Sequence, residues 1–368
     1  MKTVRRLLFR DIVSSVLFVA AAFLSLFFFI DFVDEIGKVG RSGYTVGQAA
    51  LSSLLKIPSY FYELFPIAVL IGTIFSLTRM AQASEYTILR TAGLAPVRAL
   101  GLLTTLGLFF AVCTFLMGDY VAPPAERASM LVRAQRYGSQ YGVSGAWLRD
   151  RALLPEGERT YSVSLRRAVS DTQFEDVRIF EFDALGRLLS RTHAGSGRVD
   201  GEGVWTLSDV QLTRWPVGVA DNAVVHSEHR PTATWHSRLT TGVVAAALLP
   251  VTTMSTVELW RYTGHLTEHK QASQRHALRL WRKVLYPFAC IVMVALALPF
   301  AYLQARSGGA SLKVFGGILL GISFVLLDNV AGHLGLLHGW TPWVVAAVPS
   351  LLYLMMSLGA FWWLVRYR

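Results

Sequence analysis

The chain has 368 residues, of which 53% are hydrophobic and 16% are charged, and its formal net charge is +11. A composition this apolar excludes an ordinary soluble enzyme and is typical of a membrane protein. The positive charge needs no nucleic acid partner, because membrane proteins carry Lys and Arg in their short cytoplasmic connections and tolerate them in long outer domains.

Six apolar runs are long enough to span a membrane, which takes about 20 residues of helix for a core of about 30 Å. The predicted spans are 12–33, 59–77, 97–119, 284–303, 312–332 and 341–365. The first follows a basic segment, as a secretory signal does, but the apolar FLSLFFFI beyond its small residues favours an uncleaved span.

The basic residues of the short connections predict the orientation. The N-terminal segment, the connections 78–96 and 304–313 and the tail VRYR carry Lys or Arg, whereas the turn 333–341 carries none. Both termini are therefore expected in the cytoplasm and the long segment after the third span outside it. Cys113 and Cys290 fall in predicted spans, so no disulfide framework is expected.

Four segments follow from this layout: 1–139 with three spans and a short helix at 84–93, a β domain at 140–238, a connector and amphipathic helix at 239–283, and three spans at 284–368. Within the β domain, apolar and polar residues alternate in five runs, 160–169, 177–183, 186–194, 204–215 and 223–235. This alternation predicts an antiparallel sheet or sandwich. Its apolar face is either a packed sandwich core or a trough that accepts lipid chains and pairs with another protein by strand addition.

The stretch QASEYTILRTAGLAP between spans two and three predicts a short cytoplasmic helix. Ser84 suits the N-cap, Glu85 the positive helix end and Gly93 the C′ position. Its apolar side chains, among them Tyr86 and Leu89, indicate either a helix lying in the lipid interface or one that docks into a cytoplasmic partner.

No residue cluster predicts catalysis or metal binding. The chain has no P-loop, H-E-x-x-H, G-x-S-x-G or closely spaced Cys pair. His265, His269 and His276 fall on a polar helix, where a solvated face is the simpler interpretation. We expect a protein that is not an enzyme and binds no cofactor itself, so that any ATP-driven motion requires a partner ATPase.

Charged residues near the membrane have two interpretations each. Glu63 and Asp328 lie within predicted spans, where they are either functional or paired with a neighbouring helix. Two basic clusters follow spans one and three, the first with Lys38 and Arg41 and the second with Arg127, Arg133 and Arg136. They form either a headgroup-contacting surface or an anion-binding rim above a lipid cavity.

Several segments together resemble the lipopolysaccharide-export permease family, and its LptG branch more closely than its LptF branch. They are FVDEIGKVG, LFPIAVLIGTIFSLTRMAQASEYTILRTAG, GDYVAPPAERA, RAQRYG, LWRKVLYPF and VLLDNV. The resemblance covers nearly the whole chain. It implies an α-helical polytopic protein of six transmembrane helices with an inserted, β-jellyroll-like periplasmic domain, in the bacterial inner membrane.

The resemblance also implies partners and roles. The partners would be an LptF-like permease, a dimer of the LptB-like ATPase, which uses ATP and Mg, the periplasmic bridge proteins LptC and LptA, lipopolysaccharide and membrane lipids. The residues expected to contact the ATPase are Ser84, Glu85, Tyr86, Leu89, Arg90 and Gly93. Those expected at the lipid phosphates are Lys38, Arg41, Arg133 and Arg136, whereas Asp31 stands where relatives can carry a basic residue. The gate or cavity residues would be Phe27, Phe28, Leu64, Phe324 and Leu327.

The favoured hypothesis is therefore an ATP-driven permease that extracts lipopolysaccharide from the outer leaflet of the inner membrane. The alternative is a membrane-anchored periplasmic assembly or sensor protein without transport activity. Six spans with polar residues inside them, and a cytoplasmic helix with apolar side chains, favour the first.

Overall fold

The computed structural model describes residues 2–40, 44–91, 96–137, 146–154, 157–168, 172–216, 225–241, 244, 253–268, 274–302 and 310–367. The chain divides into two compact units. The helical unit comprises Met1–Val132 and Ala277–Arg368, and the β unit comprises Arg133–His276. The β unit thus also takes in most of the segment 239–283 that the sequence assigned to a separate connector.

The helical unit contains the predicted membrane spans. Its elements are α1 (Lys2–Ile36), α2 (Val46–Gln82), α3 (Glu85–Thr91), α4 (Pro96–Leu116), a π-helical turn (Met117–Val121), α5 (Ala122–Tyr137), α8 (Gln274–Tyr302), α9 (Ala310–Leu337) and α10 (Pro342–Tyr367). Six helical segments in the described residues are long and apolar enough to cross a membrane, which confirms the predicted number. The helices extend beyond the apolar runs because polar residues continue a helix past the hydrocarbon region.

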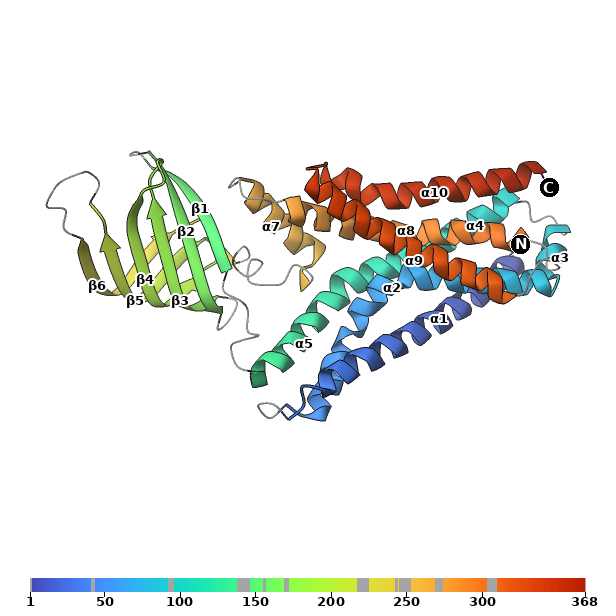
Figure 1. Ribbon diagram of the computed structural model, residues 1–368, viewed down its shortest axis with the longest axis horizontal. Helices are drawn as coiled ribbons and strands as arrows, with labels where there is room; N and C mark the ends of the chain where they lie inside the picture. Colours follow the sequence, from blue (N-terminus) through green and yellow to red (C-terminus); the bar gives the residue numbers. More distant parts are fainter. Residues whose placement is uncertain are drawn as a thin grey trace. The chain divides into compact units, whose positions relative to one another are not determined.

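The core of the helical unit is built around α2. Residues from Phe65 to Ile74 on this helix are buried on every side, as expected for a helix that is apolar all round. Helix α1 packs closely against it: a β-carbon on Gly72 would lie only 2.6 Å from Cα of Val16. Figure 1 shows α3, the first turn of α1 and the last turn of α10 at the same end of this unit.

The β unit contains one antiparallel sheet in the described residues. Its strands follow each other in sequence order: β1 (Ala146–Leu154), β2 (Gly157–Ala168), β3 (Gln173–Phe182), β4 (Leu188–Val199), β5 (Val204–Arg214) and β6 (His226–His236). Helix α7 (Thr256–Glu268) follows in the same unit. The helical membrane protein with an inserted β domain is thereby confirmed. The jellyroll part of the prediction is not, because the described strands form a single sheet rather than two.

A row of interrupted strand pairing crosses this sheet. Between neighbouring strands from β2 to β6, one residue pair is absent from the pairing, while the register on either side of it is the same. The residues of these absent pairs form a row across the sheet: Arg166, Asp176, Gly195, Asp209 and Pro231. Asp176 and Asp209 have left-handed φ angles of 52° and 56°. Asp adopts this conformation more readily than most residues because its short polar side chain bonds locally. We call this row the crease.

The crease keeps the apolar side chains on one face. Residues three apart on a strand normally point to opposite faces. Across the crease, however, Phe174 and Val177 on β3 are both buried, and so are Leu207 and Val210 on β5. A left-handed residue within each interval shifts the pleat by one position, so the buried face continues across the sheet.

The surroundings of the Asp176 carboxyl lead us to expect that the stability of the β unit depends on pH. Burial on its own raises the pKa of this carboxyl. Hydrogen bonds from Arg178 (2.9 Å), His193 (3.0 Å) and Arg166 (3.2 Å), together with the charge of Arg178, outweigh it, so the pKa lies below its ordinary 3.8. A depressed pKa stabilises the fold above pH 3.8, and that contribution is lost as pH falls through the folded-state value. Asp176→Asn is therefore expected to speed hydrogen exchange in β3 to β5 of the full-length protein at neutral pH, with the difference from the parent vanishing in acid.

Asp176→Ala is the companion variant. Alanine lacks the local hydrogen bonds that favour the left-handed region, so it should destabilise the crease by a further ~1–2 kcal/mol at every pH. A difference between Asp176→Asn and the parent that stays constant with pH would contradict the electrostatic explanation.

Candidate functional site

Helix α3 is attached firmly to the end of α2. The turn between them is closed by two backbone hydrogen bonds, from the Ala83 N–H to the Arg79 carbonyl (3.0 Å) and from the Ser84 N–H to the Ala81 carbonyl (3.2 Å). The Ser84 carbonyl then accepts from Ile88 N–H (3.0 Å), so Ser84 opens the helix. Its φ of 61° is left-handed, whereas an N-cap residue is usually extended.

The side chains of α3 face two ways. Leu89 is partly buried against the core of the helical unit. Ile88 is 63% exposed, and Glu85, in the first turn, is exposed as well. Among the expected ATPase contacts, Leu89 therefore anchors α3 to its own chain. Ile88, which was not among them, is an exposed apolar side chain of α3. Tyr86 and Arg90 belong to α3 but their side chains are not described, and Gly93 lies outside the described residues.

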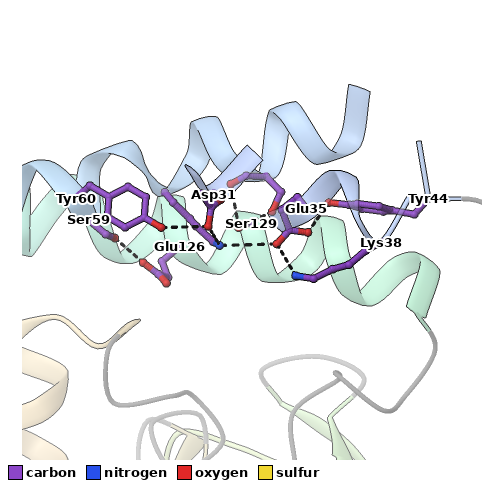
Figure 2. Close-up of polar contacts among 10 residues, drawn as sticks. Asp31, Glu35, Lys38, Tyr44, Ser59, Tyr60, Glu126 and Ser129 are labelled. Carbon is purple, nitrogen blue, oxygen red and sulfur yellow. Dashed lines mark hydrogen bonds and ion pairs between the residues drawn. The ribbon is translucent and has the colours of Figure 1, made fainter. Parts of the chain in front are cut away.

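A charge cluster joins the last turns of α1 to the first half of α2, whereas α3 follows the other end of α2. Figure 2 shows its polar contacts. Lys56 Nζ lies 2.5 Å from Asp31 Oδ1 and 3.8 Å from Glu35 Oε1. Tyr60 donates to Asp31 (3.1 Å) and Tyr44 donates to Glu35 (3.3 Å). The two carboxylates come from α1, and Lys56 and Tyr60 come from α2. Lys56 was not predicted from the sequence, where it is a lone cation in an apolar run.

Lys38 completes this cluster. Its Nζ lies 3.1 Å from Glu35 Oε1, and its side chain is 43% exposed, whereas Glu35 is buried. The Glu35 carboxylate thus holds Lys38 at the edge of the cluster, where part of its side chain is exposed. Arg41, expected beside it, lies outside the described residues. Arg133 and Arg136 belong to α5, but their side chains are not described.

Two further contacts tie α2 to α5 next to the cluster. Ser59 Oγ donates to Glu126 Oε2 at 2.5 Å, and the hydroxyls of Ser52 and Ser129 lie 3.0 Å apart (Figure 2). Hydroxyl contacts of this kind fix helix pairs in membranes, where no water competes for them.

The expected gate residues occupy different environments. Phe27 lies beside Tyr60, with ring centroids 5.5 Å apart, and Phe28 stacks on Phe32 at 5.9 Å. Phe324 is 3% exposed and packs edge-on against Tyr353, within the core of the helical unit. Leu327 is partly buried against the same core, and Leu64 is partly exposed. Phe27 thus borders the charge cluster, Phe28 stacks within α1, and Phe324 serves the packing of α9 on α10.

Asp328 and Glu63, two carboxylates within predicted spans, have different surroundings. Asp328 Oδ2 lies 3.2 Å from Arg282 Nη2, which pairs α9 with α8. Glu63 is exposed on α2, and it makes no hydrogen bond or ion pair through its carboxylate within the described part of the chain. In the same part of the chain no group of three metal-ligating side chains comes together.

Nearly the whole chain matches known proteins. The family model described as lipopolysaccharide export system permease LptF/LptG matches residues 6–366. The lipopolysaccharide export system permease protein LptG of Haemophilus influenzae is 28% identical over 367 residues, covering 99% of this chain and 98% of the relative. The protein of the same name from Escherichia coli K12 is 28% identical over 359 residues, covering 97% and 96%.

These relatives are permeases of the LptG type, and they do not favour the anchored sensor. With its six spans, its inserted β domain and a family match over almost its full length, this chain belongs to the lipopolysaccharide export system permease family LptF/LptG and is a permease rather than an enzyme.

Proposed function

We propose that this chain is the LptG-type half of an ATP-driven lipopolysaccharide exporter and that α3 is the element through which the motor acts on it. The observation that carries this proposal is the position of Ile88. An apolar side chain that is 63% exposed, on a helix held to the bundle by Leu89, is suited to docking into a cleft of another protein. Glu85 beside it adds a charge for orientation.

The partner at α3 is an LptB-like ATPase, present as a dimer so that an LptF-like permease engages the second copy. ATP and Mg are bound by that ATPase, and this chain binds no cofactor. Ser84, Glu85, Tyr86, Ile88, Arg90 and Gly93 form the contact surface. Extraction needs such an energy source, because each CH₂ of an acyl chain contributes ~0.8 kcal/mol to membrane retention.

The orientation follows from this assignment. The end of the helical unit that carries α3, the start of α1 and the end of α10 faces the cytoplasm, and the basic connections agree with it. The β unit then lies in the periplasm, where it passes the lipid toward LptC and LptA. The charge cluster lies at the opposite end of α1 and α2, near the outer leaflet.

The lipid is recognised at that outer end. Lys38, whose side chain is 43% exposed, and Arg41, Arg133 and Arg136 contact its phosphates. The gate and cavity side chains Phe27, Phe28, Leu64 and Leu327 contact its acyl chains, while Phe324 supports the gate from within the core. Of the two lysines in the charge cluster, Lys38 is the more exposed, since the Lys56 side chain is 16% exposed, so Lys38 is the better placed to meet the phosphates.

Ile88→Asp tests the proposal. An aspartate at this position places a charge in an apolar cleft, so the ATPase should dock poorly and lipopolysaccharide transfer by the reconstituted complex should fall about tenfold or more, the range of typical coupling energies. Transfer is measured in proteoliposomes with a periplasmic acceptor, and ATPase retention is measured by co-purification. Leu337→Asp is the matched control. Leu337 is 80% exposed at the end of α9, next to the start of α10, and α10 runs from there to the end of the helical unit that carries α3 (Figure 1). Full transfer by Ile88→Asp, or equal loss in the control, would refute the role of α3.

A further inference from the structure

We propose that α1 and α2 move as one rigid lever and that Asp11, Ser76 and Arg79 pass the movement of α3 into α1. The proposal rests on the proposed function of α3, and it assigns a positioning role to three residues for which the family match implies none. The lever is defined by contacts between α1 and α2 near α3, midway along the helices, and at the charge cluster.

The contacts near α3 converge on Arg79. Its carbonyl accepts the hydrogen bond that closes the turn into α3, from Ala83 N–H. Its guanidinium pairs with the carboxylate of Asp11 on α1. The same carboxylate accepts from Ser76 Oγ at 2.5 Å, one turn earlier on α2. Besides the packing of Leu89, Arg79 thus offers a polar route from α3 to α1, with its backbone bonded on one side and its side chain on the other.

The middle of the lever has no room for sliding. Gly72 approaches the backbone of Val16 so closely that an added β-carbon would lie 2.6 Å from Cα and 2.7 Å from the backbone nitrogen of Val16. Val16 itself is fully buried. Two helix backbones in such contact are held by close packing, which stabilises helix pairs in membranes.

The charge cluster holds α1 to α2 at the end of the lever away from α3. Lys56 on α2 bridges Asp31 and Glu35, which lie one turn apart on α1, and Tyr60 adds a second bond to Asp31. These charges are largely buried, so their separation would leave unpaired charges in a medium of low dielectric constant. The two helices are thus pinned at both ends and packed in between.

The opposite face of α1 is free to act as the moving surface. Phe18 is 73% exposed, Phe29 is 63% exposed and Leu26 is 52% exposed, all on the same helix that α2 holds. A rigid lever turns a small tilt at α3 into a displacement of this face, without any change in the packing between α1 and α2.

A disulfide between α1 and α2 distinguishes a rigid lever from a mechanism in which the two helices move against each other. The variant carries Asp11→Cys and Ser76→Cys, whose parent side chains meet at 2.5 Å, in a background with Cys113→Ala and Cys290→Ala. In the reduced form the link from Arg79 to α1 is missing, so lipopolysaccharide transfer per ATP hydrolysed should fall about tenfold. Oxidation replaces the polar link by a covalent one and should return transfer to the value of the cysteine-free parent.

Two outcomes would overturn the lever. If oxidation blocks transfer, α1 must move against α2 during the cycle. If the reduced variant transfers as well as its parent, Asp11 and Ser76 do not transmit motion.

A charge exchange provides the second measurement. Asp11→Arg and Arg79→Asp should each lower transfer, and the double variant, which restores a pair and the net charge, should recover it to within about twofold. Arg98→Asp is the control, because Arg98 is exposed at the start of α4 and makes no ion pair in the described residues. Failure of the double variant to recover would overturn the role of the pair. Ile88→Asp reports on the proposed function independently: full transfer by that variant refutes the docking of α3, whatever the disulfide shows.

Discussion

Lys56→Met is expected to lower the free energy of unfolding of the helical unit by about 3–5 kcal/mol, the range for removing one partner of a buried ion pair. Lys56 is the cation that the structure places between Asp31 and Glu35, which are 8% and 1% exposed. Methionine matches the length of lysine and keeps the packing, so the loss comes from the two carboxylates. Asp31 then keeps the hydrogen bond from Tyr60 of α2, but no cation of α2 pairs with it.

Lys38→Met is the matched control. Lys38 pairs with the same Glu35, but its side chain is 43% exposed, so its removal should cost no more than about 1 kcal/mol. Adding Asp31→Asn and Glu35→Gln to Lys56→Met removes the charges and should recover most of the stability. Thermal unfolding of the purified protein in detergent measures all three variants. Equal melting temperatures for Lys56→Met and Lys38→Met would show that the cluster contributes nothing through burial.

The sequence predicted the parts of the fold that local pattern determines. An apolar run of about 20 residues has few alternatives to a spanning helix, and all six runs form such helices. Alternation predicted β2 to β6 within a few residues. It missed β1, because Arg149, Asp150 and Arg151 interrupt its pattern. Asp150 is in fact buried, and it accepts hydrogen bonds from Ser237 Oγ (2.5 Å) and Arg238 N–H (3.0 Å), which no local pattern reveals.

The candidate site shows the same limit. The helix after span two was predicted from its turn signals, and it forms. Ile88 and Leu89 are adjacent apolar residues, and the packing of α3 decides which of them faces the bundle. Leu89 faces it, and Ile88 stays exposed. Lys56 was missed because a single lysine in an apolar run acquires meaning only when Asp31 and Glu35 lie opposite on another helix. The charge cluster forms through contacts between two helices, and the spacing of residues along one helix does not predict such contacts.

Trp205→Ala is expected to destabilise the β unit by about 3–5 kcal/mol, the usual cost of removing a buried tryptophan. Trp205 is fully buried, and its ring lies 5.7 Å from that of Phe174 and 6.0 Å from that of Trp235. Its Nε1 donates to the Leu239 carbonyl at 3.2 Å. Alanine leaves a cavity among these rings and removes the hydrogen bond that ties the chain beyond β6 to the sheet.

Trp147→Ala is the control for that prediction. Trp147 is 65% exposed on β1 and stacks on Phe180 at 5.8 Å, so its loss should cost about 1 kcal/mol, the value of an aromatic pair. Hydrogen exchange of the full-length protein measures both variants, with β3 to β5 as the reporter and α2 as the internal reference. Faster exchange in the sheet alone, and only for Trp205→Ala, is the expected result. Faster exchange in α2 as well would mean that the two units unfold together, because a cavity in one compact unit weakens the other only when their unfolding is coupled.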